Sequence, residues 1–231
     1  MSLNNRLELF ELRNQERMQT IEKHLRLGVE FFCTDGIMID DSVIIGKNTV
    51  ILPGTILRGD TVIGEGCTIG PNSLIEDSVV GDGCKVNACQ IYKSRLHNNV
   101  TMGPFCHIRP NCEILDDVHI GDFVEVKNSV IGKATHIAHL TYVGDSDVGE
   151  RVNFGGGVIT VNYDGRNKWR TTVGNDAFIG CNCNLVAPVT LGDGCFTAAG
   201  STITEEVPAN ALGIARARQA NKPDWAKGRR K

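Results

Sequence analysis

This sequence has few aromatic residues, no long apolar run and no strong net charge. Phe, Trp and Tyr make up only 6% of the 231 residues, a scarcity that fits an interior too narrow for rings. No apolar run approaches the roughly 20 residues that span a bilayer, and the N-terminus lacks the apolar segment of a signal peptide. The net charge of -3 argues against a nucleic-acid-binding protein. We therefore expect a cytoplasmic protein with no membrane and no nucleic-acid partner.

What the sequence does contain is an aliphatic residue at every sixth position. The series begins with Ile39, Ile45 and Ile51 and continues, with occasional five-residue steps, to Ile203. A short repeat of this kind is the signature of a parallel β-helix. Three hexads make one triangular coil of about 18 residues, so residues three hexads apart stack at about 4.8 Å. An ordinary β-sandwich would not keep this register for so long.

The cysteines fit the same register. The small position of the repeat that points inward is occupied by six cysteines, namely Cys67, Cys84, Cys106, Cys112, Cys183 and Cys195. A thiol at such a position acts as a small apolar group. No pair of cysteines has zinc-finger spacing. We therefore expect free thiols in a reducing cytoplasm rather than disulfides or a metal.

The repeat divides the chain into three segments. Residues 1–36 carry no hexads and show rough helical spacing, which predicts an N-terminal helical linker. Residues 37–207 form the solenoid, and residues 208–231 form an irregular tail rich in Arg and Lys, which is either a solvated end or a contact for an anionic ligand. One insertion, residues 160–172, interrupts the solenoid. Insertions in repeat proteins often carry function.

Two columns of the solenoid indicate chemistry. Arg109 and Lys127 occupy the same corner on adjacent coils, where two unpaired cations repel each other and a phosphate would relieve the repulsion. A second corner column reads His139, Gly156, Cys181 and Ala199. Its small residues leave a smooth wall for an elongated ligand, and backbone amides near Gly156 lie where they would hold an oxyanion. The alternative for each column is a set of solvated side chains.

Six segments make the sequence recognisable. They are Arg109-Pro110, residues 121–127 (Gly-Asp-Phe-Val-Glu-Val-Lys), residues 139–145 (His-Leu-Thr-Tyr-Val-Gly-Asp), residues 162–168 (Asn-Tyr-Asp-Gly-Arg-Asn-Lys), residues 185–190 and residues 211–216. In order and spacing they resemble the acetyltransferase domain of the bacterial bifunctional N-acetylglucosamine-1-phosphate uridylyltransferase/glucosamine-1-phosphate acetyltransferase family. The resemblance covers nearly the whole chain.

The resemblance implies a left-handed β-helix that forms a homotrimer with sites at the subunit contacts. It also implies acetyl transfer from acetyl-CoA to the amine of glucosamine 1-phosphate, a step toward UDP-N-acetylglucosamine. His139 would be the general base, supported by Glu125. The substrate-binding residues would be Arg109, Lys127, Tyr142, Asn153, Asn162, Tyr163 and Lys168. The acetyl-CoA-binding residues would be Gly156, Cys181, Ala199 and Arg216.

The sequence departs from the family in three respects. Gly156 stands where Ala is common, and Cys181 stands where Ser is common. The uridylyltransferase domain is absent, and with it the only expected use of magnesium. The opening residues resemble the family's interdomain linker, which favours a piece of a bifunctional protein over a free-standing acetyltransferase.

Three other functions remain open at this point. One is a hexapeptide acyltransferase for another amino sugar, although three cations around a neutral acceptor would have no purpose. Another is a zinc-dependent trimer similar to the gamma-class carbonic anhydrases, because His119 and His136 stack on a flat face. That reading needs a third histidine from a neighbouring subunit. The last is a scaffold without catalysis, which would leave His139 without a role.

Overall fold

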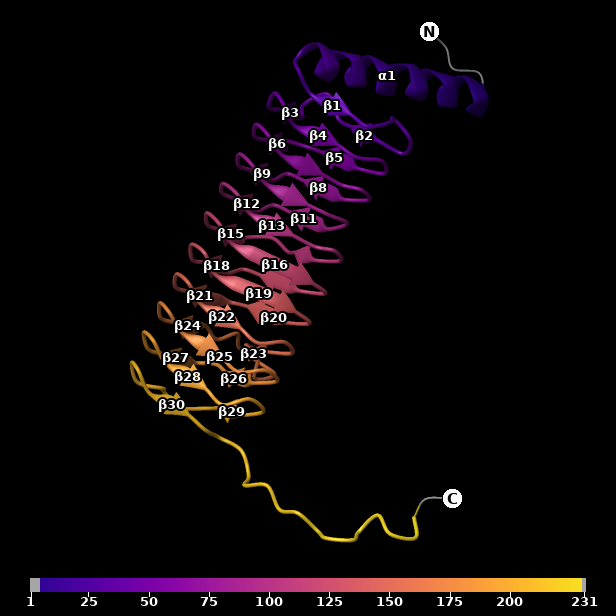
Figure 1. The fold of residues 1–231 in the computed structure, drawn as a ribbon. Helices are drawn as coiled ribbons and strands as arrows, with labels where there is room; N and C mark the ends of the chain where they lie inside the picture. Colours follow the sequence, from indigo (N-terminus) through magenta and orange to yellow (C-terminus); the bar gives the residue numbers. More distant parts are fainter. Residues whose placement is uncertain (1–4, 230–231) are drawn as a thin grey trace.

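The protein is a long parallel β-helix with one helix across its N-terminal end. A computed structural model describes residues 5–229. Helix α1 (Arg6–Arg26) begins at the N-cap Asn5, whose side chain accepts the amide of Glu8 at 2.9 Å. Figure 1 shows α1 lying across the top of the solenoid and projecting beyond its edge. Ile21 and His24 of α1 are buried, so the helix covers the open end of the first coils. None of the described helices is long and apolar enough to cross a membrane.

Within residues 5–229, thirty short strands form three parallel sheets, A, B and C, which are the faces of a triangular prism (Figure 1). Sheet A stacks β1 (Glu30–Phe31), β4 (Val50–Ile51), β7 (Thr68–Ile69), β10 (Lys85–Val86), β13 (Thr101–Met102), β16 (His119–Asp122), β19 (His136–His139), β22 (Asn153–Phe154), β25 (Phe178–Ile179), β28 (Phe196–Thr197) and β30 (Leu212–Gly213). Sheet B stacks β2 (Met38–Ile39), β5 (Ile56–Arg58), β8 (Leu74–Glu76), β11 (Gln90–Tyr92), β14 (His107–Ile108), β17 (Glu125–Lys127), β20 (Tyr142–Gly144), β23 (Ile159–Val161), β26 (Asn184–Val186) and β29 (Thr202–Ile203). Sheet C stacks β3 (Ile44–Ile45), β6 (Val62–Ile63), β9 (Val79–Val80), β12 (Arg95–Leu96), β15 (Glu113–Ile114), β18 (Val130–Ile131), β21 (Ser146–Val148), β24 (Thr171–Val173) and β27 (Val189–Leu191).

The interior confirms the predicted repeat. The aliphatic positions from Ile39 to Ile203 are buried, and so are all six cysteines assigned to the inward position. Among the inward hydroxyls, Thr55 Oγ1 donates to the carbonyl of Leu52 at 2.7 Å, whereas the buried Thr171 Oγ1 has no partner within residues 5–229. The predicted solenoid boundaries at 37 and 207 lie slightly inside the paired region, because β1 already pairs with β4 and β30 pairs with β28. After β30 the described tail contains no strand.

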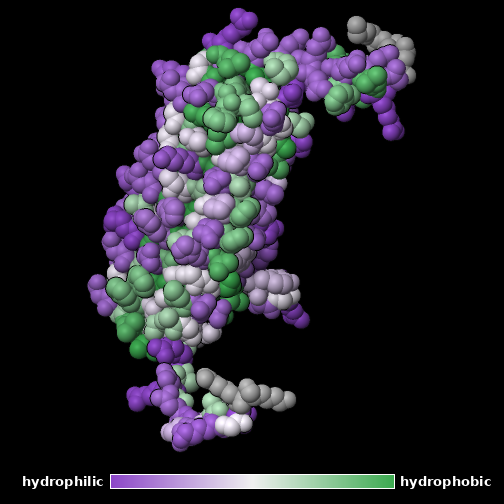
Figure 2. Space-filling model, turned by 45° about the vertical axis from the view of Figure 1, so that its right-hand side comes forward, coloured by the Kyte–Doolittle hydropathy of each residue, from purple (hydrophilic) through white to green (hydrophobic). Residues whose placement is uncertain are grey.

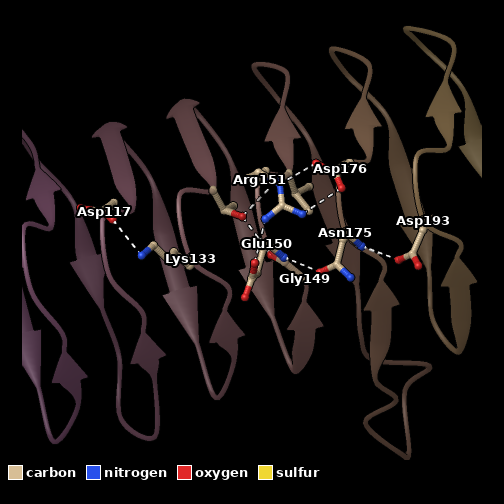
Figure 3. Close-up of polar contacts among 10 residues, drawn as sticks. Asp117, Lys133, Gly149, Glu150, Arg151, Asn175, Asp176 and Asp193 are labelled. Atoms are coloured by element: carbon tan, nitrogen blue, oxygen red, sulfur yellow. Dashed lines mark hydrogen bonds and ion pairs between the residues drawn. The ribbon is translucent and has the colours of Figure 1, made fainter.

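The corner between sheets C and A is held by a ladder of polar contacts (Figure 3). The amide of Glu150 donates to Asn175 Oδ1 at 2.9 Å, and the amide of Asn175 donates to Asp193 Oδ1 at 2.7 Å. Arg151 donates two hydrogen bonds to the Asp176 carboxylate, from Nε at 2.7 Å and from Nη2 at 3.0 Å. Asn175 and Asp193 thus accept hydrogen bonds from backbone amides of the same corner, one coil earlier. The chemistry predicted from the sequence lies instead at the other two corners, A–B and B–C.

Candidate active site

The candidate site surrounds the outer face of sheet B in the coils of β17, β20 and β23. His139, the last residue of β19, stands at the A–B corner on one side of this face. Lys127, the last residue of β17, stands at the B–C corner on the other side. Glu125 and Tyr142 are cross-strand partners on the face between them. The predicted base and the predicted cation site therefore border one strip of sheet.

His139 is exposed and bonded to a carboxylate. Its Nδ1 lies 3.1 Å from Asp122 Oδ1. Asp122 is its direct partner in the ladder between β16 and β19. The Asp122 backbone amide and the bonded imidazole lower the pKa of the Asp122 carboxyl. Sequence reasoning missed Asp122, although it precedes His139 by one coil and the register alone would have paired them.

Glu125 occupies a different place from the one that its predicted supporting role required. Its Oε1 accepts Arg109 Nη1 at 3.0 Å. The carboxylate bonded to His139 is Asp122. The picture of an unpaired Arg109 is likewise corrected, because Glu125 partly compensates its charge. The direct partner of Glu125 in the ladder is His107, so Arg109 bonds to Glu125 diagonally across sheet B. Counting residues along a column does not predict a diagonal contact.

The predicted small-residue column is present beside His139. A Cβ placed on Gly156 would lie 3.5 Å from the Cβ of His139. The ladder continues from there: the amide of Asn182 donates to Gly156 O, and the amide of Gly200 donates to Cys181 O, both at 2.8 Å. Cys181 is exposed. A Cβ on Gly200 would lie 3.9 Å from Arg216 Cδ, so Arg216 flanks the far end of the column.

The backbone around His139 is fixed from the next coil. The carbonyl of His139 accepts the Thr141 hydroxyl at 2.7 Å and the amide of Gly157 at 3.3 Å. The amide of Gly155 donates to Ile179 O at 2.7 Å. Among residues 5–229, the amide of Gly156 has no such acceptor. It is therefore the amide of this turn that remains for a ligand.

Lys127 and Lys168 form the cationic side of the site. The amine of Lys168, with burial second, lowers the pKa of Lys127, and Arg109 acts in the same direction. Asp145 opposes this shift. Lys168 belongs to the inserted loop, so the insertion brings a third cation to the column predicted from Arg109 and Lys127. Two amines this close favour an anion between them.

A buried polar cluster anchors the start of the inserted loop. Asp145 accepts the amide groups of Asn162 and of Asn128, the latter at 2.5 Å. Asn162 Nδ2 also lies 3.4 Å from the Tyr142 hydroxyl. Asp145 and Asn162 are buried. Asn162 therefore anchors the start of the loop to Asp145 and contacts the Tyr142 hydroxyl.

The loop itself is tied into a compact turn. Asp164 accepts the indole N–H of Trp169 and the amides of Arg166 and Asn167, each at 2.7 Å. These bonds, the indole first, lower the pKa of Asp164 to about 2. Tyr163 pairs with Lys168 across the turn, which presents both side chains from one hairpin.

The end of the loop is clamped to the sheet. Arg170 Nε donates to Asp147 Oδ2 at 2.8 Å, and Arg170 Nη1 donates to the carbonyl of Asn128 at 3.2 Å. Asn128 thus contacts Arg170 at the end of the insertion directly, and it is linked to Asn162 at the start through Asp145. The position of Lys168 is consequently set by the coils below the loop.

Asn153 is the predicted substrate-binding residue that lies apart from the others. It belongs to β22 and pairs with His136 and Phe178 on sheet A. Tyr142 and Lys127 belong to sheet B. Within one chain these residues therefore lie on different faces of the prism, as expected if a site draws on two subunits.

The stacked histidines of sheet A are also where the sequence placed them. The ring centroids of His119 and His136 are 5.7 Å apart. Thr101 Oγ1 lies 2.8 Å from His119 Nδ1, and burial, followed by the charges of His136 and His139, lowers the pKa of His119. Within residues 5–229, no three His, Cys, Asp or Glu side chains gather to hold a metal ion.

Known proteins share this sequence over most of its length. The family described as "GlmU-like, C-terminal hexapeptide" matches residues 69–159, and "Bacterial transferase hexapeptide (six repeats)" matches residues 42–77 and 170–205. The chain is 51% identical to the bifunctional protein GlmU of Geobacillus sp. (strain WCH70), over 97% of this chain and 49% of that protein. It is 52% identical to the bifunctional protein GlmU of Caldanaerobacter subterraneus subsp. tengcongensis, over 99% of this chain and 50% of that protein.

The chain spans about half the length of these relatives. The matched part carries the hexapeptide repeat, whose solenoid the structure displays as stacked parallel strands. The repeat, the fold and the similarity over nearly the whole chain show that this protein belongs to the hexapeptide-repeat family that includes the C-terminal part of the bifunctional GlmU proteins.

Proposed function

We propose that this protein transfers the acetyl group of acetyl-CoA to the amine of glucosamine 1-phosphate. The observation that carries the proposal is the strip of sheet B between His139 and the Lys127–Lys168 pair. An imidazole with one free nitrogen stands at one edge, and a repelling pair of amines stands at the other. An acceptor with an amine and a phosphate on adjacent carbons satisfies both edges.

The base chemistry follows from the imidazole. Asp122 holds Nδ1, so Nε2 takes a proton from the substrate nitrogen, and the second proton that the sugar ammonium loses goes to solvent. The amine nitrogen bonds to the thioester carbonyl carbon, and the C–S bond then breaks. The free Gly156 amide stabilises the oxyanion between these events. His139 returns the proton to the departing thiolate, and the products are the N-acetyl sugar phosphate and CoA.

The remaining predicted residues bind and orient the substrates. Arg109, Lys127 and Lys168 bind the phosphate, and Tyr142 binds a sugar hydroxyl. Asn162 and Tyr163 position the sugar from the loop, and Asn153 contributes from sheet A of a neighbouring subunit. Cys181, Ala199 and Arg216 border the acetyl-CoA channel that extends from His139 along the A–B corner.

A homotrimer is the assembly that we propose for this function. Exposed apolar side chains run along the solenoid (Figure 2). Phe105, Phe123 and Leu140 form a ridge beside His139 and are exposed by 60%, 55% and 63%. Packing this ridge against a neighbouring subunit would close the site from water. The product would be the precursor of UDP-N-acetylglucosamine in the cytoplasm. Any uridylyltransferase activity, with its magnesium, would belong to a domain outside this chain.

A thiol-release assay with acetyl-CoA tests the proposal. Glucosamine 1-phosphate, glucosamine 6-phosphate and glucosamine are compared as acceptors, and His139→Ala is the inactive control. We expect the 1-phosphate to be strongly preferred and the variant to lose about 10² to 10⁴-fold in kcat. Equal rates with all three acceptors would overturn the phosphate site, and an active variant would overturn the base.

A further inference from the structure

We propose that Asp122 is the positioning residue that fixes the tautomer and direction of the His139 imidazole. This role rests on the acetyl transfer proposed above. It assigns to Asp122 the support that the family resemblance had suggested for Glu125.

The pairing is built into the two strands. β16 and β19 each contain four residues, and the ladder between them runs from His119↔His136 to Asp122↔His139. The carbonyl of Asp122 also accepts the amide of Leu140 at 3.0 Å, directly after the histidine. The backbone of Asp122 therefore bonds to Leu140, and its side chain bonds to the neighbouring His139. These two contacts keep the Asp122 carboxylate next to the His139 ring.

Gly121 makes this close approach possible. A Cβ at that position would lie 1.9 Å from the carbonyl oxygen of Ala138, well inside van der Waals contact. Only glycine allows β16 to run beside β19 as far as the corner. The Gly121-Asp122 pair thus places one carboxylate one strand spacing from the base.

The chemistry of the contact fixes the roles of the two ring nitrogens. The pKa of Asp122 is lowered, so its carboxylate is ionised near neutral pH and only accepts hydrogen bonds. The proton of neutral His139 must then reside on Nδ1. Nε2 is left with a lone pair, as a general base requires, and the carboxylate stabilises the imidazolium that forms after proton transfer.

The other ionisable groups near His139 do not offer this support. His119 and His136 lie on sheet A and are cationic or neutral, never anionic. Cys181 lies beyond Gly156 in the corner column. Glu125 is engaged by Arg109. Asp122 is therefore the carboxylate bonded to His139 within the described chain.

Nitrogen NMR of the whole protein tests the tautomer without any substrate. In the native protein, we expect the His139 ring to be protonated on Nδ1 and bare on Nε2. Asp122→Ala should give a mixture of both tautomers. The matched control is Glu113→Gln, which removes the other His–carboxylate contact, His97 Nε2 to Glu113 Oε1 at 3.0 Å, on sheet C. It should leave His139 unchanged.

Kinetics test the consequence. Asp122→Asn should lower kcat by about 10- to 100-fold, less than loss of the base itself, with little change in KM. Asp122→Glu should recover part of the rate, and Glu113→Gln should retain all of it. An unaltered His139 tautomer in the Asp122 variants would refute the positioning role. A native protein that acetylates no amino sugar would refute the proposed function instead. The NMR experiment would still show whether Asp122 fixes the His139 tautomer.

Discussion

Lys127 and Lys168 bring two amines together, and no carboxylate within residues 5–229 bonds to both of them. This pair is therefore the part of the site where an anionic ligand would relieve the most repulsion. The pKa of Lys127 is lowered chiefly by Lys168. Between that lowered pKa and its usual value near 10.4, the folded chain binds fewer protons than the unfolded chain, so folding stability rises with pH in this window. A bound phosphate would move the pKa of Lys127 back toward its usual value.

Replacing either lysine should therefore separate binding from folding. Lys127→Ala and Lys168→Ala should each weaken glucosamine 1-phosphate binding by about 1.5 to 3 kcal/mol, the usual value for a charged hydrogen bond. Neither should lower the melting temperature of the free protein, because the repulsion is gone. Calorimetric titration and thermal melts measure the two effects. Lys133→Ala, at the C–A corner beside Asp117, should change neither binding nor the choice of acceptor; a loss of affinity as large as that of Lys127→Ala would exclude a specific phosphate site.

Cys181 is the exposed member of nine free cysteines, and seven others are buried. Its thiol should react first with a labelling reagent in the native protein, and acetyl-CoA should slow that reaction if the corner column is the coenzyme wall. Cys181→Ser should remove the fast phase, whereas Cys33→Ser should leave it. Mass spectrometry identifies the labelled residue. Labelling of Cys181 that ignores acetyl-CoA would place the coenzyme elsewhere.

At the scale of single residues, the register predicted whatever depends on stacking. His139, Gly156 and Cys181 share a column, and Arg109 and Lys127 share another, as counting in hexads indicated. Counting in hexads could not predict contacts that run diagonally across strands or that come from a loop. Arg109 reaches Glu125 across strands, and Lys168 reaches Lys127 because Asp145 and Asp147 fix both ends of the insertion. Rotamers and loop conformation decide these contacts, and neither has a six-residue period.

At the scale of the element, the corner between β16 and β19 depends on glycine. Gly121→Ala should force the two strands apart, because the new Cβ meets a backbone oxygen that cannot move freely. We expect a loss of stability of about 1 to 3 kcal/mol, as for overpacking in a core, together with lower activity. Denaturant unfolding measures it.

Gly156→Ala is the matched control for that substitution. Its Cβ would meet neighbours only at 3.5 and 3.7 Å, which is ordinary contact, so stability should be unchanged. Equal stability of the two variants would contradict the close approach of β16 and β19.

The strands themselves were predictable because each hexad carries its own aliphatic residue and turn. The limits of the solenoid were less so. The first and last strands, β1 and β30, pair outside the residues where the hexad spacing is regular. Backbone hydrogen bonds extend the sheet there without needing the side-chain pattern, so the sequence gives no signal.

At the scale of the whole molecule, one chain exposes its candidate site on sheet B and keeps Asn153 on sheet A. If a trimer joins these faces, mixing His139→Ala chains with Asn153→Ala chains should restore turnover, because some mixed sites contain both native residues. Each variant alone should be nearly inactive. Light scattering should report a trimer for both.

Two results would contradict that arrangement. A fully active monomer would show that one chain builds the site alone. Proven mixed trimers without recovered turnover would assign Asn153 and His139 to the same chain's site.

The helix that covers one end of the solenoid makes its two ends unequal. α1 buries Ile21 and His24 against the first coils, whereas the last coil is continued by a tail that contains no strand in its described part. In a stack where each coil contacts only its neighbours, opening starts at the ends and moves inward. Amide hydrogens should therefore exchange fastest near β30 and more slowly toward the middle. The coil of His139 lies well inside the stack, so the base remains folded while the far end frays and re-forms.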